Sequence, residues 1–284
     1  TLWSDAPAQS LKFGLELILT VVAAILLFRN ASARTLILVM FLGLLLVCLW
    51  ALSAVPTALS TGYPMKAFFG SKNELGMMAQ LLFALALAIV FDRQRGAALR
   101  LLSIAAMVLA IALLMLSQSI TAQVCTAITA VVFPVLLLFG RFPLAVRIGS
   151  VVMLVVAMGV ALPFVETITS GIENFRGTVL NKDASLTGRT YLWEVAAQVS
   201  AERPWLGHGY GAFWRPGNLD AEALWRWGGV ANKTGFSFHN AFVEMRVDLG
   251  LVGFVLLALT CAAILLLGIV RQVWRPSVTM AFIV

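Results

Sequence analysis

The run TLILVMFLGLLLVCLWALSAV, residues Thr35 to Val55, decides the fold class of this chain. It holds no charged side chain, and a helix needs roughly 20 apolar residues to cross the hydrocarbon core of a bilayer. Its apolar residues are continuous and rich in leucine rather than alternating, which argues against a membrane β-strand. The run therefore predicts a membrane-spanning helix.

Other apolar runs of similar length follow the same pattern along the chain. We expect an all-α, polytopic transmembrane bundle with seven full spans and a partial eighth that begins near residue 277. Of 284 residues, 61% are hydrophobic and 12% are charged, whereas about a quarter are charged in soluble domains. This composition excludes a soluble enzyme, a disordered tail and a secreted disulfide scaffold. The seven runs are residues 11–28, 35–55, 74–91, 99–116, 121–139, 146–165 and 250–270.

The cysteines give no sign of a metal or disulfide framework. Cys48, Cys125 and Cys261 all lie inside apolar runs, where a thiol acts as a small core residue. No Cys/His cluster with the spacing of a metal site occurs, so we expect neither a metal nor another cofactor. The chain starts at Thr1 without methionine and ends inside the apolar run 278–284, so we expect a piece of a longer membrane protein.

Arginines give the predicted helices an orientation. If the spans alternate, nine arginines fall in loops on one side, while the opposite short loops hold only Lys12, Lys66 and Lys72. The positive-inside rule places the arginine side in the cytoplasm and the start of the chain outside. The net charge of +7 then reflects topology, and no nucleic-acid partner is needed to explain it. The nine are Arg29, Arg34, Arg93, Arg95, Arg100, Arg141, Arg147, Arg271 and Arg275.

One connection is much longer than the others. We divide the chain into a six-span bundle (1–165), an extracytoplasmic loop with short helices (166–249), and a C-terminal part with the seventh span and the start of the next (250–284). Long loops with structure of their own usually carry function. The loop holds both histidines, His208 and His239, and five of the eight tryptophans. We therefore expect catalysis in the loop.

Within this loop the sequence predicts two helices. The first begins at Thr187-Gly188, has an apolar face of Leu192, Val195, Ala196 and Val199, and stops before Pro204. The second runs from His239 to Leu249 at the membrane surface and ends at Gly250. The glycines at 207, 209 and 211 between them indicate a tight turn rather than a phosphate-binding loop, because no strand precedes them.

Four polar clusters are candidates for chemistry, and the predicted topology puts all four on the outer side. This convergence favours an active site at the outer membrane surface. The clusters are Gly70-Ser-Lys-Asn-Glu-Leu-Gly76, Ser117-Gln-Ser-Ile-Thr121, Thr187-Gly-Arg-Thr-Tyr-Leu-Trp193 and Phe238-His-Asn-Ala-Phe242.

The cations of these clusters have two interpretations each. Lys72 is either an interfacial lysine or a phosphate contact at a helix start, where Glu74 would compete with an anion. Arg189 is either a surface arginine or a diphosphate clamp, because a guanidinium offers a rigid fork of donors.

The histidines differ in the strength of their case. His239 is either an interfacial residue or a general base, since its ordinary pKa of about 6.5 suits proton transfer near neutral pH. Glu244 is five residues on, so it is not well placed as a partner on the same helix face. His208 has the weaker case, because it lies in a glycine-rich turn.

The ordered motifs resemble those of the O-antigen ligase and polymerase superfamily, and most closely its exopolysaccharide (succinoglycan-type) polymerase branch. The similarity runs from about residue 66 to 257. The quoted elements are Gly-Ser-Lys-Asn-Glu-Leu-Gly, Leu-Ser-Gln-Ser-x-Thr, Thr-Gly-Arg-x-x-Leu-Trp, Pro-Trp-Leu-Gly-His-Gly-Tyr-Gly and Phe-His-Asn-x-Phe followed by Asp-Leu-Gly-Leu-Val-Gly.

This resemblance implies a helical fold similar to lipid-linked-sugar glycosyltransferases and metal-independent, inverting transfer. It implies that Arg189 handles the donor diphosphate with Lys72 and Asn73, and that His239 activates the acceptor hydroxyl. Many members carry Arg or Lys where this chain has Ile120. Either another cation (Lys72, Arg215 or Arg246) substitutes, or this branch binds the donor differently, and an inactive member is a further alternative. The expected supporting residues are Ser119, His208, Arg215, Asn240 and Arg246.

The function that follows is a polysaccharide polymerase of the bacterial inner membrane. It would move glycan repeats from undecaprenyl diphosphate to an acceptor glycan at the outer face of the lipid bilayer, in exopolysaccharide biosynthesis. The resemblance leaves open a chain-length-regulating copolymerase as a further partner. Alternatives are an O-antigen ligase that delivers glycan to lipid A core or protein, a transporter or flippase, and a structural or sensory membrane protein. A transporter usually places ionisable groups near the bilayer midplane, whereas these spans are nearly free of charge.

Overall fold

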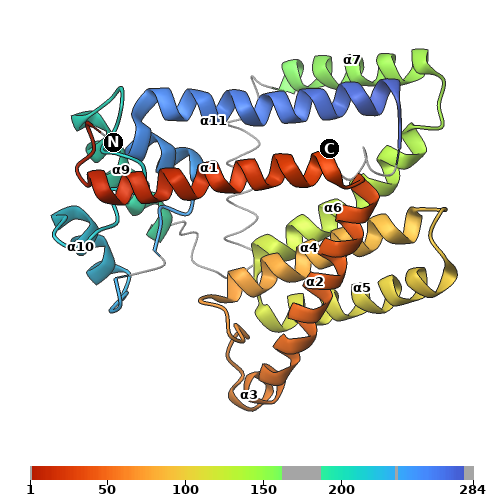
Figure 1. The fold of residues 1–284 in the computed structure, drawn as a ribbon, viewed down its shortest axis with the longest axis horizontal. Coiled ribbons are helices and arrows are strands. Elements are labelled where there is room, and N and C mark those ends of the chain that lie inside the picture. Colours follow the sequence, from red (N-terminus) through yellow and green to blue (C-terminus); the bar gives the residue numbers. More distant parts are fainter. Residues whose placement is uncertain (1, 162–186, 234–235, 278–284) are drawn as a thin grey trace. The chain divides into compact units, whose positions relative to one another are not determined.

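The computed structural model describes residues 2–161, 187–233 and 236–277. The regular secondary structure of these residues consists of helices alone. The long apolar runs of the sequence account for most of these helices, which Figure 1 labels in chain order. They are α1 (Pro7–Asn30), α2 (Ala33–Ala51), the short 3-10 helix η1 (Leu52–Ala54), α3 (Val55–Thr61), α4 (Lys72–Phe91), α5 (Ala97–Ser117), α6 (Ile120–Phe139), α7 (Leu144–Ala161), α9 (Thr187–Glu202), α10 (Leu219–Trp227) and α11 (Ala241–Trp274).

The prediction of a polytopic helical membrane protein is confirmed. Six helical stretches in the described residues are long and apolar enough to cross a membrane, and they contain six of the seven predicted runs. The run 146–165 lies partly on α7, whose apolar stretch Leu144–Leu154 is shorter, and partly outside the described residues. The predicted eighth run, from about 277, also lies almost wholly outside them.

The chain divides into two compact units, which we describe one at a time. The loop unit comprises residues 1–23 and 150–264, and the bundle unit comprises residues 24–149 and 265–284. The division into 1–165, 166–249 and 250–284 expected from the sequence stays a prediction.

Helix α4 forms the centre of the bundle unit, where it packs against α2, α5 and α6. Leu75, Leu82, Leu85 and Ile89 are almost fully buried along it, because neighbours cover the helix on several sides. Burying a leucine or isoleucine side chain contributes about 1.5–3 kcal/mol in water, but lipid offers no such gain, so close van der Waals packing holds this core together.

The arginine-bearing connections meet at one end of the bundle unit. Arg34, which follows the first run, lies 3.2 Å from the Asp92 carboxylate, and Arg95, which follows the third, lies 3.5 Å from it. A pocket of about 630 Å³ at this end is also lined by Arg93, by Arg141 after the fifth run, and by Gln272 after the seventh. The prediction that these connections share one side of the bundle is therefore confirmed, while its assignment to the cytoplasm stays a prediction.

The loop unit has a core of its own, built from α9 and the aromatic residues that follow it. Leu192, Ala196 and Val199 of α9 are buried, as their spacing predicted, and Val195 packs against them at the edge. They contact Phe213, Leu224, Trp225, Phe238 and Val247. This core brings together segments from 192 to 247 in the sequence.

Candidate functional site

Helix α11 is broken at Gly250, and this break organises the candidate site. Gly250 has φ 62° and ψ −153°, a backbone conformation that only glycine adopts readily. A Cβ atom there would lie 2.4 Å from the backbone carbonyl carbon and oxygen of Trp205. The predicted end of the surface helix at Gly250 is confirmed, and the reason is this close approach of Trp205.

The segment Pro204–Gly209 supplies the hydrogen bonds that the break removes from the helix. The N–H groups of His208 and Gly209 donate to the carbonyls of Val247 (3.0 Å) and Asp248 (2.8 Å). In return, the N–H groups of Leu251 and Val252 donate to the carbonyls of Pro204 (2.8 Å) and Trp205 (3.2 Å). Every backbone group at a helix end needs a partner, and here residues 204–209 and residues 247–252 supply partners to each other. We call these two segments the interlocked motifs.

Gly207, Gly209 and Gly211 make this interlock a tight turn, as predicted. Their φ angles are 63°, 111° and 66°, which favour glycine. A Cβ on Gly207 would lie 2.5 Å from the backbone of Asp248. The N–H of Gly211 donates to the Asp248 carboxylate at 2.7 Å, which fixes the far end of the turn.

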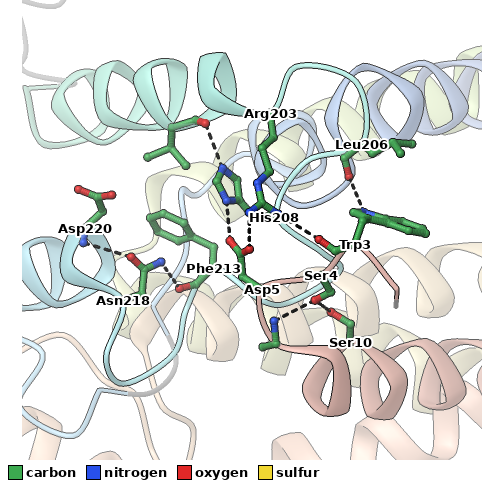
Figure 2. A network of polar contacts seen from close by, with 12 residues as sticks. Trp3, Ser4, Asp5, Ser10, Arg203, Leu206, His208, Phe213, Asn218 and Asp220 are labelled. Atoms are coloured by element: carbon green, nitrogen blue, oxygen red, sulfur yellow. Dashed lines mark hydrogen bonds and ion pairs between the residues drawn. The ribbon is translucent and has the colours of Figure 1, made fainter.

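His208 is a structural residue of this turn and binds the start of the chain. Its Nδ1 lies 2.8 Å from the Asp5 carboxylate and its Nε2 lies 3.1 Å from the carbonyl of Val199. Asp5 also pairs with Arg203 at 2.8 Å, and Figure 2 shows the network with Trp3 and Leu206 at its edge. Both ring nitrogens of this buried histidine are occupied, which leaves none to act on a substrate.

His239 lies on the turn that leads into α11. The predicted helix start at His239 is wrong: α11 begins at Ala241. Asn240 accepts a hydrogen bond from the Phe242 N–H at 3.0 Å and so caps the helix, while His239 has φ 54°, outside the helical region. His239 is exposed at the end of the loop, just before this cap.

The residue before His239 is held on both sides of its backbone. The Glu244 carboxylate accepts the Phe238 N–H at 3.0 Å with Oε2 and the Trp214 indole N–H at 2.6 Å with Oε1. The Trp193 indole donates to the Phe238 carbonyl at 2.8 Å. Since Phe238 itself is fully buried, these three contacts fix the peptide that presents His239.

Arg189 and His239 are close enough to interact electrostatically. The pKa of His239 lies below its ordinary value of 6.5, mainly because nearby protein atoms displace part of the water around the exposed ring and so disfavour its charged form, and secondly because of the positive charge of Arg189. The structure thus brings together the two residues that the sequence singled out for the loop. A lowered pKa keeps the imidazole in its neutral, proton-accepting form over a wider range of pH.

A mostly apolar pocket of about 520 Å³ lies between α9 and both halves of α11. Its polar lining residues are Ser200, Asn240 and Arg246. Arg246 donates to the carbonyl of Pro204 at 3.1 Å, and the Ser200 hydroxyl is buried with no hydrogen-bond partner among the described residues. Two of the predicted supporting residues, Asn240 and Arg246, therefore line one pocket beside His239.

The predicted supporting residue Arg215 lies on the loop between the glycine turn and α10. Its backbone N–H donates to the carbonyl of Phe213 at 2.9 Å. Its Nε atom is buried with no hydrogen-bond partner in the described part of the chain.

Lys72, Asn73 and Ser119 meet in the bundle unit, at the end opposite the arginines. The Ser119 hydroxyl donates to the Asn73 side-chain oxygen at 3.0 Å, and Lys72 Nζ donates to the carbonyl of Gln118 at 3.4 Å. A Cβ on Gly76 would lie 2.7 Å from that of Ser119, so this glycine permits the contact. Since Arg189 belongs to the loop unit, a diphosphate site shared with Lys72 stays a prediction.

Glu74 and Ile120 also have local explanations. The Ser71 hydroxyl caps α4 by accepting the Glu74 N–H at 3.2 Å, and the Glu74 carboxylate in turn accepts the Gly70 N–H at 3.1 Å. Ile120 is the first residue of α6 and is exposed, and the ammonium of Lys72 lies on the carbonyl of Gln118, two residues before it. In the described ranges, no group of three or more His, Cys, Asp and Glu side chains could hold a metal ion.

Comparison with known proteins agrees with this arrangement. Residues 105–258 match the O-antigen ligase family, and the match contains Arg189, His239 and the interlocked motifs. The chain belongs to the O-antigen ligase family. It is 35% identical over 262 residues to the exopolysaccharide production protein ExoQ of Rhizobium meliloti (strain 1021); the alignment covers 90% of this chain and 59% of that protein. No solved structure matches the chain.

Three features of this protein were not among the predictions made from its sequence. Helix α10 is capped by Asn218, which accepts the Asp220 N–H at 3.2 Å, and Asn218 followed by two acids was a usable signal. The contacts of Glu244 with Phe238 and of Asp5 with His208 were not foreseeable from spacing, since each depends on how the loop folds back.

Proposed function

We propose that this protein is a polysaccharide polymerase of the bacterial inner membrane. It would transfer glycan repeats from undecaprenyl diphosphate to a growing sugar chain at the outer face, in exopolysaccharide biosynthesis. The family membership and the similarity to ExoQ support a membrane enzyme of polysaccharide production. The single observation that carries the mechanism is that Arg189 and His239 lie near enough, in the part of the chain between membrane spans, for the arginine charge to act on the imidazole.

In the proposed reaction, His239 removes the proton from a hydroxyl of the acceptor glycan. The oxygen attacks the anomeric carbon of the donor sugar as the bond from that carbon to the diphosphate oxygen breaks. The electron pair of the broken bond goes to the leaving undecaprenyl diphosphate, and Arg189 stabilises the charge that develops there. The proton stays on the imidazole until solvent takes it.

The apolar pocket between α9 and α11 suits the lipid side of such a donor. Its apolar lining includes Phe242, Leu251 and Phe254, and Arg246 lies in the same lining as a cation for a phosphate. We propose that it holds the first part of the polyprenyl chain. Arg246 is then the cation that serves where Ile120 cannot.

Two substitutions test the mechanism in cells. We expect Arg189→Ala and His239→Ala each to abolish polymer while the protein level in the membrane stays normal, because both side chains are exposed. The measurement is polymer size and yield in a deletion strain complemented with each variant. His208→Ala is the contrasting variant, and it should lower the protein level because its ring is buried and doubly bonded. Normal polymer from His239→Ala would remove this residue from the mechanism.

The family description favours one second candidate, an O-antigen ligase. The bonds formed and broken would be the same, and only the acceptor would differ. Deletion of the gene separates the two functions. Accumulated single repeats on lipid would indicate a polymerase, whereas accumulated long polymer on lipid would indicate a ligase.

A further inference from the structure

We propose that a second pocket of the loop unit, lined by Trp214, Trp225 and Phe236, binds a sugar ring of the acceptor glycan and presents it to His239. This inference rests on the proposed transferase function and adds the place of the acceptor. Three independent features of the described residues carry it: the aromatic lining, the position beside His239 and a buried indole N–H.

The pocket has the size and the lining of a carbohydrate subsite. Its volume is about 290 Å³, near the lower end of the range for ligand pockets. Aromatic rings with polar edges suit a sugar, because the apolar face of a pyranose packs on a ring while its hydroxyls reach donors nearby. The lining residues are Gln9, Phe13, Gly211, Trp214, Trp225, Lys233 and Phe236.

Phe236 connects this pocket to the candidate base. Its ring lies edge-on to the His239 ring, with 5.8 Å between the two centroids. Trp214, also in the lining, donates to the Glu244 carboxylate that holds the peptide before His239. A sugar on these rings would therefore lie one aromatic ring away from the imidazole.

Trp225 supplies the observation that points to a ligand. The residue is 2% exposed, and its indole N–H has no hydrogen-bond partner among the described residues. A buried donor without a partner costs about 1–3 kcal/mol, so each such group in a native protein calls for a reason. A sugar hydroxyl that accepts this N–H would be that reason.

Another pocket adjoins the aromatic pocket and gives the glycan room to continue. It has a volume of about 370 Å³, shares Trp225 and Lys233 with the first, and is also lined by Glu222 and Arg226. Lys233 pairs with Glu222 at 3.2 Å. Charged and hydroxyl-binding groups at this edge suit the following sugars of a chain.

The loop leading to His239 contributes to pockets of two kinds. Phe236 lines the aromatic pocket, and Asn240 lines the apolar pocket proposed for the donor lipid. His239 stands between these two residues in the sequence. This arrangement assigns the acceptor to the aromatic side and the lipid-linked donor to the apolar side of one base.

The test is Trp225→Phe, which keeps an aromatic ring and removes the N–H. The assay uses membranes that contain the protein, lipid-linked repeat from a deletion strain as donor, and the same repeat released from its lipid by mild acid as acceptor. We expect the KM for the released oligosaccharide to rise about 3- to 10-fold, as for the loss of one hydrogen bond, with kcat within about twofold. Trp227→Phe is the matched control, since this exposed tryptophan packs on Tyr191 and is absent from the lining of both pockets.

Stability separates a binding role from a structural one. Trp225 belongs to the buried core, so Trp225→Phe should lower the melting temperature in detergent through the cavity it leaves, with no added loss from the N–H, which has no partner in the described chain. Trp193→Phe removes a satisfied N–H as well as volume, so it should lower the melting temperature while the KM for the oligosaccharide stays unchanged. A KM for the oligosaccharide that is unchanged in Trp225→Phe, or that rises as much in Trp193→Phe, would overturn the proposal.

Direct binding keeps this proposal apart from the proposed function. Saturation-transfer NMR with the released oligosaccharide and detergent-solubilised protein needs no turnover. We expect signals with the wild type and with His239→Ala, and weaker signals with Phe236→Leu. If His239→Ala is fully active and the oligosaccharide still binds, His239 is not the base, but the proposed acceptor pocket stands. Binding that is equal in wild type, Trp225→Phe and Phe236→Leu would refute the pocket alone.

Discussion

The bundle unit and the loop unit are each stabilised by a different kind of internal contact. In the bundle unit, α4 is buried by small and aliphatic residues, and Gly43 of α2 has open space around it. In the loop unit, two chain segments exchange backbone hydrogen bonds, and Gly207 and Gly250 each meet backbone atoms at about 2.5 Å or less. In the bundle unit a Cβ on Gly76 would meet side-chain atoms of Ser119 and Ala122, whereas in the loop unit Gly207 and Gly250 face backbone atoms, so the loop unit depends more strictly on its glycines, and it is there that we place the chemistry.

The largest expected effect is on the break in α11. Gly250→Ala forces a Cβ to 2.4 Å from the backbone of Trp205 in a conformation suited only to glycine, so we expect a loss of roughly 3 kcal/mol or more. The readout is the amount of folded protein in the membrane and its melting temperature in detergent.

Two other glycines separate the cost of the backbone conformation from the cost of the close contact at Gly250. Gly229 has φ 67° but open space, so Gly229→Ala tests the backbone conformation alone and should cost about 1–2 kcal/mol. Gly43 lies in a helix with open space, so Gly43→Ala should be neutral or slightly stabilising. Equal melting temperatures for all three variants would contradict the difference between the units.

The next effect concerns the peptide before His239. Glu244→Gln offers one acceptor oxygen where two N–H groups now bind, so either Phe238 or Trp214 loses its partner. We expect kcat to fall roughly 10- to 100-fold with KM nearly unchanged, because the base is misplaced rather than removed. Glu194→Gln on the exposed face of α9 is the control. A rise in KM at constant kcat would show that Glu244 acts on binding instead.

A smaller effect concerns the electrostatics of the base. Arg189→Gln removes a positive charge that favours neutral His239, so the pKa of His239 should rise towards its ordinary value. Modification by diethyl pyrocarbonate requires a neutral ring, so its pH profile at His239, mapped by mass spectrometry, reports that pKa. The acid limb should move to higher pH in Arg189→Gln and stay in place in Arg189→Lys.

The same shift fixes the sign of a stability change. Folding favours neutral His239, so its contribution to stability is complete above pH 6.5, the pKa of a free histidine, and declines as the pH falls below it. Buried His208 is the internal reference for the modification experiment, since both its nitrogens are bonded. An acid limb that does not move in Arg189→Gln would show that burial alone lowers the pKa.

The sequence predicted much of the helical architecture, because hydrophobic runs and apolar periodicity indicate burial directly. It placed six of the spans, the buried face of α9 and the break at Gly250. It could not place Glu244 against Phe238, because that contact depends on a loop folding back over α11. It treated His208 as a candidate, since its partner Asp5 is distant in the sequence and the docking of residues 3–9 on the turn leaves no local pattern.

The smallest expected effect lies in the bundle unit, at the contact between α4 and α6. Ser119→Ala removes a hydrogen bond of 3.0 Å to Asn73, whose exposed side chain can turn to water instead. We expect a loss of about 0.5–1.5 kcal/mol, seen as a melting temperature a few degrees lower, with Ser53→Ala as the exposed control. If Asn73 also contacts the donor, the KM for the lipid-linked repeat should rise in Asn73→Ala beyond its value in Ser119→Ala. Equal KM values in the two variants would limit this contact to helix packing and leave the loop unit as the place of the chemistry.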